Sequence, residues 1–174
     1  PINYYGFSKL EGEKYIRSLL KKYIIIRAGW LFGFKGNNFV KTILKISKNK
    51  EIRIVDDQFG VPTPTDLFAK DVLHISNYLL NNEEDNLYGT YHYTCKPSTS
   101  WHNFAEYIIN SSYKKGLINN KPKVIPIKTT QYNFIASRPK NTILNSDKIN
   151  KNFNVISSEW KIYLNKLIDK LKNE

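Results

Sequence analysis

The stretch Ser8-Lys-Leu-Glu-Gly-Glu-Lys-Tyr-Ile-Arg-Ser-Leu-Leu-Lys-Lys-Tyr-Ile-Ile-Ile-Arg27 joins a helix pattern to a buried-strand pattern. Its first part predicts a helix over residues 8–20, because apolar side chains recur at helical spacing. Tyr23–Arg27 follows with three consecutive isoleucines, and such β-branched runs are typical of a parallel strand covered on both faces. A helix that leads directly into a buried strand is half of a βαβ unit. The sequence therefore predicts an α/β fold with a parallel sheet.

The rest of the chain continues this alternation of helix and strand patterns. Strands are expected at Glu51–Val55, Tyr88–Tyr93 and Val124–Ile127. Helices are expected over Asn38–Lys48, from Thr65 or Asp66 to about Leu80, after a cap at Ser98, Thr99 or Ser100, and after a cap at Ser157 or Ser158. Between them, Asp56–Thr65 is polar and punctuated by Gly and Pro, which favours a binding loop over a simple connector.

Composition limits the class of protein. The chain has 174 residues, of which 41% are hydrophobic and 14% aromatic, enough for the core of one domain. No apolar run reaches the roughly 18 residues needed to cross a bilayer, and no signal-peptide pattern is present. The single cysteine, Cys95, cannot form an internal disulfide, which fits a reducing compartment. We expect a cytoplasmic protein with no membrane partner.

The net charge of +12 raises the hypothesis of nucleic-acid binding. The cations are nearly all scattered lysines, however, without an arginine-rich stripe. Lys, Asn and Ile are inflated together, as an AT-rich genome would produce. We therefore expect no nucleic-acid partner, although an anionic small substrate is compatible with the charge.

Tyr5 and Lys9 are the first candidate catalytic pair. Residues four apart share one face of a helix, and a neighbouring ammonium stabilises phenolate and lowers the pKa of a tyrosine. A tyrosine tuned in this way can act as a general acid or base. The spacing alone is weak evidence, because a chain with 12 tyrosines and many lysines contains such pairs by chance. A surface pair on a helix is the plain alternative.

Two other positions are weighed in the same way. Trp30 follows the predicted strand Tyr23–Arg27, and ligands of open α/β sheets lie beyond the carboxyl ends of strands. Ligand contact and capping of the core are equally compatible with that position. His92 and Cys95 have the spacing of a metal-ligand pair, but one pair is not a metal site. Gly12 inside the first helix is expected to allow close packing.

Together these stretches resemble the dTDP-4-dehydrorhamnose reductase family of the extended short-chain dehydrogenase/reductases. The resemblance covers essentially the whole chain, and the ordered motifs are more specific than any one of them. They are Tyr5-Gly-Phe-Ser-Lys9-Leu-Glu-Gly-Glu13, Arg27-Ala-Gly-Trp-Leu-Phe-Gly33, Asp57-Gln-Phe-Gly-Val-Pro-Thr63, Ser98-Thr-Ser-Trp101 and Ala136-Ser-Arg-Pro-Lys-Asn141.

The resemblance implies an activity, which is reduction of the C4 ketone of dTDP-4-dehydro-L-rhamnose by NADPH or NADH. The product, dTDP-L-rhamnose, serves cell-surface polysaccharide such as lipopolysaccharide O-antigen. Tyr5 would donate the proton. Lys9 would lower its pKa and hold the nicotinamide ribose, so both residues would also contact the cofactor. Trp30 would contact the sugar, and Arg138 would face either substrate or a structural carboxylate.

The resemblance also implies an incomplete enzyme. The family's Gly-rich phosphate turn and first Rossmann strands are absent, so we expect the C-terminal part of a Rossmann-type parallel sheet plus a small α/β substrate-binding domain. Residues 1–29 and about 60–93 would belong to the Rossmann domain, and about 30–59 and 94–174 to the substrate-binding domain. The 174 residues alone are expected to be inactive.

Other readings stay open at this stage. Some family members bind Mg²⁺ at a dimer contact, and Asp66 lies near a matching acidic position. One carboxylate does not predict a metal site, so no metal ligand is assigned, and a homodimer is compatible with the family. The alternatives are a non-catalytic relative, such as the regulatory β subunit of methionine adenosyltransferase, and another nucleotide-sugar reductase or epimerase. Retention of both Tyr5 and Lys9 favours the reductase.

Overall fold

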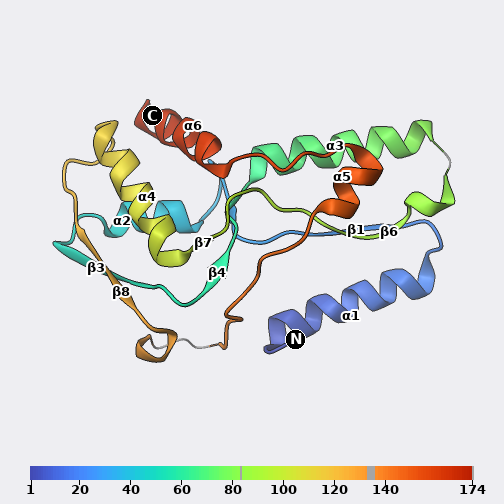
Figure 1. Cartoon of the computed structure of the whole chain (residues 1–174), viewed down its shortest axis with the longest axis horizontal. Coiled ribbons are helices and arrows are strands. Elements are labelled where there is room, and N and C mark those ends of the chain that lie inside the picture. Colours follow the sequence, from blue (N-terminus) through green and yellow to red (C-terminus); the bar gives the residue numbers. More distant parts are fainter. Residues whose placement is uncertain (83, 133–135, 174) are drawn as a thin grey trace.

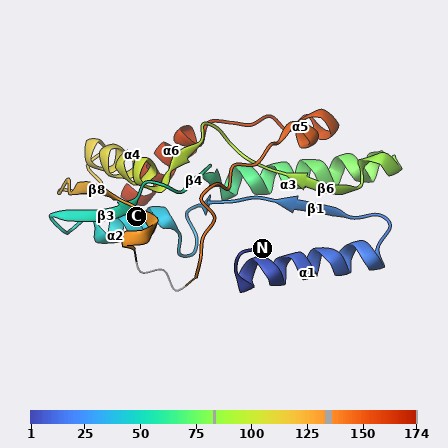
Figure 2. The same cartoon turned by 60° about the horizontal axis from the view of Figure 1, so that its bottom comes forward.

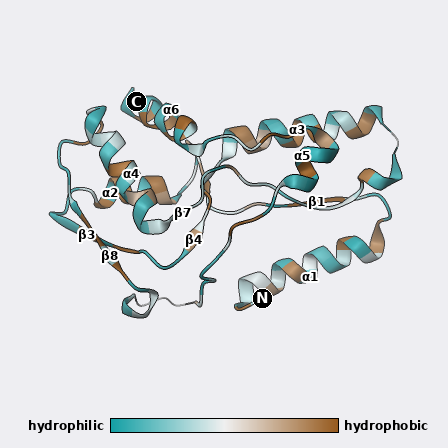
Figure 3. Cartoon of the chain, viewed as in Figure 1, coloured by the Kyte–Doolittle hydropathy of each residue, from teal (hydrophilic) through white to brown (hydrophobic). Residues whose placement is uncertain are grey.

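The computed structural model describes residues 1–82, 84–132 and 136–173. One half of the molecule is built on the parallel pair β1 (Ile24–Arg27) and β6 (Gly89–His92), in register from Ile24↔Gly89 to Arg27↔His92. Helix α1 (Tyr4–Leu19) lies on one side of this pair, and α3 (Thr65–Asn81) and α5 (Asp147–Phe153) lie on the other (Figures 1 and 2). Parallel β-branched strands need such cover, and β1 is almost wholly hydrophobic (Figure 3).

The other half is built on a second parallel pair, β3 (Glu51–Val55) and β8 (Lys123–Ile127). Helices α2 (Phe39–Ile46) and α4 (Trp101–Lys114) lie beside this pair, and α6 (Trp160–Lys172) packs on α4 (Figure 1). Short strands connect the halves. They are β2 (Leu31–Phe32) parallel to β5 (Thr63–Pro64), and β4 (Phe59–Gly60) antiparallel to β7 (Thr99–Ser100), while 3-10 turns occur at η1 (Asp85–Leu87) and η2 (Thr129–Gln131).

The core is continuous through both halves and is rich in aromatic side chains. Phe104 of α4 meets Trp160 of α6 edge to face, with ring centroids 5.1 Å apart. The Trp160 indole is almost fully buried, and its Nε1 donates a hydrogen bond to the Pro97 carbonyl at 2.8 Å. This bond satisfies the single polar atom of the indole, which would otherwise be costly to bury. The largest fully buried side chains are Trp160, Tyr91, Phe32, Phe104 and Phe153.

The structure confirms the α/β fold with parallel strand pairing. It also confirms a serine cap before α4, since the Ser100 hydroxyl accepts from the Asn103 amide at 3.1 Å. Two details of the prediction for the C-terminal part of the chain are wrong. The last helix follows Glu159 and has no side-chain cap, and α5 was not predicted, because its seven residues are too short to show helical periodicity. None of the helices in the described ranges is long and apolar enough to cross a membrane.

Helix α1 is attached to the sheet mainly by charge. It begins at Tyr4, earlier than predicted, and none of its residues, all described, is buried. The space around Gly12 is open, so the expected close packing there is wrong. The carboxylate of Glu13 instead accepts two hydrogen bonds from the Arg27 guanidinium on β1, at 2.7 Å from Nε and 2.6 Å from Nη2. Such paired, charge-assisted bonds have strict geometry, so they set where α1 lies against β1.

Neutralising Glu13 should loosen this attachment. The hydrogen bond from Arg27 holds the pKa of the Glu13 carboxyl below its ordinary value of 4.5. A lowered folded-state pKa means that the pair stabilises the fold above the ordinary value and loses this contribution as the pH falls through the lowered pKa. We expect Glu13→Gln at pH 7 to reduce the opening free energy of α1 by about 1 kcal/mol, since Arg27 is partly exposed. Amide hydrogen exchange across α1 measures it.

Glu11→Gln is the matched control, because among the described residues Glu11 pairs with Lys14 of the same helix alone, at 2.7 Å. It should leave exchange in α1 within experimental error of the wild type. Exchange in Glu13→Gln that is as slow as in the wild type would contradict a role for the pair in holding α1.

Candidate functional site

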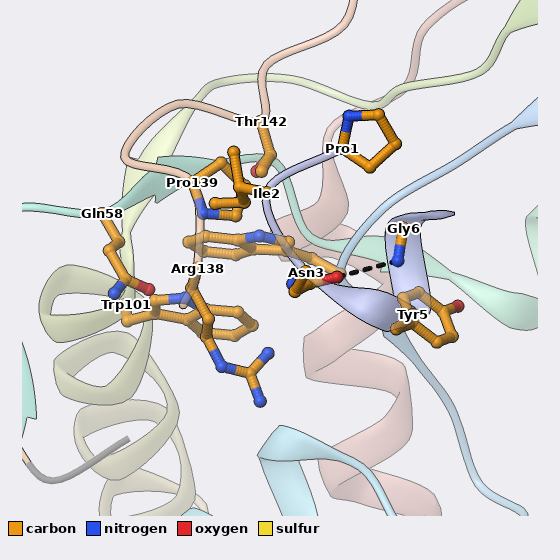
Figure 4. A pocket seen from close by; sticks show the side chains of 11 residues that line it. Pro1, Ile2, Asn3, Tyr5, Gly6, Gln58, Trp101, Arg138, Pro139 and Thr142 are labelled. Atoms are coloured by element: carbon orange, nitrogen blue, oxygen red, sulfur yellow. Dashed lines mark hydrogen bonds between the residues drawn. The ribbon is translucent and has the colours of Figure 1, made fainter. Parts of the chain in front are cut away.

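A pocket of about 580 Å³ lies where the start of α1 meets the segment that carries Arg138 (Figure 4). Three of the four residues predicted to form the site, Tyr5, Trp30 and Arg138, line it together. They come from three separate parts of the chain, so only the fold unites them. The remaining lining residues are Pro1, Ile2, Asn3, Gly6, Gln58, Trp101, Pro139 and Thr142.

Tyr5 and Lys9 lie on the same face of α1, as their spacing predicts. The Lys9 ammonium is 5.4 Å from the centroid of the Tyr5 ring. Lys9 is not among the residues that line the pocket. Tyr5 is 70% exposed, so its phenol is accessible at the mouth of the pocket rather than sealed within it.

Asn3 fixes the start of α1 at the pocket. Its side-chain oxygen caps the helix by accepting from the Gly6 amide at 2.8 Å, and its side-chain nitrogen donates to the Ser137 carbonyl at 2.8 Å. One amide group therefore joins the Tyr5 helix to the turn that carries Arg138. Asn3 was not predicted as a site residue, although an asparagine directly before a helix is a recognisable cap signal.

Trp30 is held in place by neighbours from other parts of the chain. Its ring stacks on Trp101 with centroids 3.5 Å apart and an interplanar angle of 9°. Gly60 also lies against the indole, since a Cβ atom there would come within 2.6 Å of the Trp30 Nε1. The Trp30 backbone has φ of 51°, a strained conformation for a bulky residue. A bond from the Thr63 amide to the Trp30 carbonyl, 3.0 Å, secures it.

The predicted binding loop is anchored by its first residues. The Asp57 carboxylate accepts from the Thr129 amide at 2.9 Å and from the Thr129 hydroxyl at 2.6 Å. The hydroxyl bond, with further help from the amide, keeps the pKa of Asp57 low. Gln58 follows with only 2% of its surface exposed, and its Nε2 lies 3.2 Å from the Thr129 hydroxyl oxygen. These bonds join the carboxyl ends of β3 and β8.

A second pocket, of about 380 Å³, adjoins the first. Gln58, Trp101 and Arg138 line both, so they form the boundary between two compartments of one site. Gln58 and Trp101 were not predicted as site residues. Both lie within motifs of the family, but their position between the pockets depends on the fold.

The remaining candidate ligands do not converge. Burial, with a smaller effect of Asp71, raises the pKa of the Cys95 thiol to about 12, so this thiol is protonated and unreactive at neutral pH. The His74 ring bonds to the Phe153 carbonyl at 2.9 Å. Within the described ranges no three His, Cys, Asp or Glu residues gather as a metal site.

Comparison with known proteins gives the family. The model of the RmlD substrate binding domain matches residues 1–173.

The chain belongs to this family.

Two of its relatives are dTDP-4-dehydrorhamnose reductases. The chain is 33% identical over 172 residues to dTDP-4-dehydrorhamnose reductase of Escherichia coli, covering 98% of this chain and 57% of the relative. It is 39% identical over 161 residues to the same enzyme of Aggregatibacter actinomycetemcomitans, covering 92% and 54%. This RmlD domain therefore spans little more than half the length of these curated relatives.

Solved structures agree. A dTDP-4-dehydrorhamnose reductase from Clostridium acetobutylicum matches with a TM-score of 0.86 and 38% identity, over 99% of this chain and 57% of that one. The enzyme from Bacillus anthracis, solved in complex with NADP, matches with a TM-score of 0.80 and 36% identity, over 98% and 56%. A UDP-glucuronic acid 4-epimerase at 17% identity and a TM-score of 0.72 shares the fold alone.

The packing of Trp30 in this RmlD domain can be tested at Gly60. Gly60→Ala would place a methyl group against the Trp30 indole and the Thr142 hydroxyl, so the ring must shift from its stacked position on Trp101. We expect the free energy of unfolding to fall by about 1–3 kcal/mol, as at other overpacked sites. We also expect a weaker near-UV circular dichroism signal from the stacked indoles. Thermal unfolding and near-UV spectra measure both effects.

Gly12→Ala is the matched control, since nothing lies within 4 Å of a Cβ atom there. In mid-helix it should stabilise the protein by about 0.5–1 kcal/mol without changing the near-UV spectrum. A Gly60→Ala protein with wild-type stability and an unchanged spectrum would show that Trp30 is not confined as described.

Proposed function

We propose that the residues lining the first pocket supply the proton donor and the substrate contacts for reduction of dTDP-4-dehydro-L-rhamnose to dTDP-L-rhamnose. The observation that carries this proposal is the meeting of Tyr5, Trp30 and Arg138 in one pocket. The names of the relatives supply the substrate and the reaction. NADPH is proposed as reductant in preference to NADH, because the Bacillus anthracis enzyme was solved with NADP.

The proposed roles follow from simple chemistry. Delivery of hydride to a ketone carbon leaves negative charge on the oxygen, and a phenol at hydrogen-bond distance can neutralise it by giving up its proton. Tyr5 is proposed as that phenol, with Lys9 one helical turn away on the same face of α1. Trp30 offers an apolar ring face to the sugar. Arg138, at the boundary of the two pockets, is suited to a phosphate of the dTDP group.

NADPH would supply the hydride. The chain offers a residue suited to its ribose but no turn suited to its phosphates. Lys9 is exposed beside Tyr5, where its ammonium could hold a ribose hydroxyl. No Gly-x-Gly-x-x-Gly phosphate turn occurs anywhere in the 174 residues. We propose that residues 1–29 and about 60–93 belong to a Rossmann domain whose dinucleotide turn lies outside them, and that about 30–59 and 94–174 form the substrate-binding domain.

Exposed apolar residues on α1 support this division of domains. Together they expose more apolar surface than is usual for a helix that faces solvent, and further parts of a Rossmann domain would cover them. They are Tyr4, Phe7, Tyr15, Leu19 and, just after the helix, Leu20. The wider proposal is a cytoplasmic enzyme that feeds cell-surface polysaccharide such as O-antigen, acting as a homodimer.

The first test separates binding from turnover. We expect the 174-residue chain to bind dTDP-L-rhamnose in isothermal titration calorimetry and not to oxidise NADPH when given dTDP-4-dehydro-L-rhamnose, because it has no dinucleotide turn. Absence of binding would refute the proposed substrate. NADPH oxidation by the chain alone would refute the proposed division of labour.

The second test addresses Tyr5 in a chain joined to the N-terminal half of the Clostridium acetobutylicum relative. Tyr5→Phe should lower kcat about 10²- to 10⁴-fold, the usual contribution of general acid catalysis, while NADPH binding stays within twofold. Tyr4→Phe is the matched control, because Tyr4 is 83% exposed and does not line the pocket. Equal turnover by the two variants would remove Tyr5 from the proposed role.

A further inference from the structure

Gln58 occupies an unusual position for a polar side chain. Only 2% of its surface is exposed, yet it lines both pockets. Figure 4 shows its carboxamide at the edge of the first pocket, beside Trp101 and near Arg138. Buried polar groups are nearly always hydrogen-bonded to protein or to ordered water, so the partner of each polar atom of the Gln58 amide has to be identified.

The hydrogen bonds around Thr129 fix which way the Gln58 amide points. The Thr129 hydroxyl has a single proton, and at 2.6 Å it donates that proton to the Asp57 carboxylate, which can only accept. The hydroxyl oxygen can therefore only accept from Gln58. This requires the NH₂ group of Gln58 to face Thr129, as found at 3.2 Å, and the carbonyl oxygen Oε1 to face the other way.

The Oε1 atom is thus left as an acceptor. Among residues 1–82, 84–132 and 136–173, no group donates a hydrogen bond to it. In Figure 4 the amide oxygen lies on the pocket side of the group, toward Trp101 and Arg138. Because Gln58 lines the pocket and its Oε1 is not among the buried atoms without a partner, this oxygen is open to the pocket and presents an acceptor to a ligand there.

We infer that Gln58 is a specificity-determining residue that accepts a hydrogen bond from a hydroxyl of the sugar in a dTDP-sugar. This inference rests on the proposed function. A phosphate is excluded as the partner, because a carbonyl oxygen and a phosphate oxygen are both acceptors, and Arg138 beside it is the suitable phosphate donor. The sugar is favoured over the thymine base because Gln58 shares its first pocket with Tyr5 and Trp30, where the sugar ketone would be reduced.

The test is calorimetric binding of dTDP, dTDP-L-rhamnose and analogues of dTDP-L-rhamnose that each lack one hydroxyl. Gln58→Leu should bind dTDP-L-rhamnose about tenfold more weakly, as expected for one buried hydrogen bond, and dTDP within twofold of the wild type. One deoxy analogue should bind the wild type about tenfold more weakly than dTDP-L-rhamnose does. Gln58→Leu should bind that analogue and dTDP-L-rhamnose with equal affinity. That non-additivity identifies the hydroxyl.

Two further variants guard against misfolding and general effects. Asn81→Leu makes the same kind of change at an exposed position in α3 and should bind every ligand normally. Thr129→Val retains Gln58 but removes the acceptor that orients its amide. It should therefore weaken binding of dTDP-L-rhamnose and not of dTDP. This second variant tests the inference even if Gln58→Leu fails to fold.

Each outcome decides a specific point. Unchanged affinity for dTDP-L-rhamnose in Gln58→Leu, or in Thr129→Val if the former does not fold, overturns the inference and leaves the proposed function intact. An equal loss for dTDP and dTDP-L-rhamnose places the donor on the nucleotide and also overturns it. A wild-type chain that binds neither ligand refutes the proposed function, and the inference fails with it.

Discussion

The packing of the Trp30 ring against Trp101 and Gly60 is the constraint on which the site depends. The ring joins the loop after β1, the start of α4 and strand β4, three segments that share no local sequence. Because protein interiors are packed as densely as crystals, a ring packed against both cannot shift without moving its neighbours. The positive φ of Trp30, unfavourable by itself, is retained because this packing and the bond to Thr63 outweigh it.

A second set of contacts organises the polar side of the same pocket. The Asp57 carboxylate can only accept, so the Thr129 hydroxyl donates its single proton to it. The Thr129 oxygen then accepts from the NH₂ group of Gln58, which orients the Gln58 amide. Each bond is ordinary in strength, but their order allows only one arrangement of donors and acceptors. The stacked indole rings therefore shape the pocket, and these hydrogen bonds determine which atom of the Gln58 amide faces it.

Helix α1 is held by different interactions from the rest of the molecule. The core is closed by aromatic and aliphatic packing, whereas no residue of α1 is buried. The helix is held by the Glu13–Arg27 pair, the Arg17–Thr90 hydrogen bond and the Asn3 contacts. Directional contacts position a helix accurately even where they contribute little free energy. Tyr5 is thus placed at the pocket mouth by a weakly attached element, which suits a residue whose proposed partners come from further parts of a larger enzyme.

Much of the fold and part of the site can be predicted from sequence alone, because these features are local. The run of isoleucines at residues 24–26 determines a buried parallel strand, the caps and apolar spacing determine the main helices, and the four-residue spacing places Tyr5 and Lys9 on one face. Ordered motifs also indicate the family. Short elements such as α5 are missed because seven residues carry too little periodicity.

Only the tertiary structure decides what the side chains at the pocket can do. Asn3 bonds to Ser137, Trp30 stacks on Trp101, and the Gln58 amide is turned by Thr129. These are contacts between residues distant in the chain, and no local pattern encodes which atom of an amide faces a cavity. Sequence thus determined the fold class, the helix that carries Tyr5 and Lys9, and the family, through periodicity and motif order. The meeting of Tyr5, Trp30 and Arg138, and the free acceptor of Gln58 among the described residues, depended on close packing and on the pairing of donors with acceptors in three dimensions.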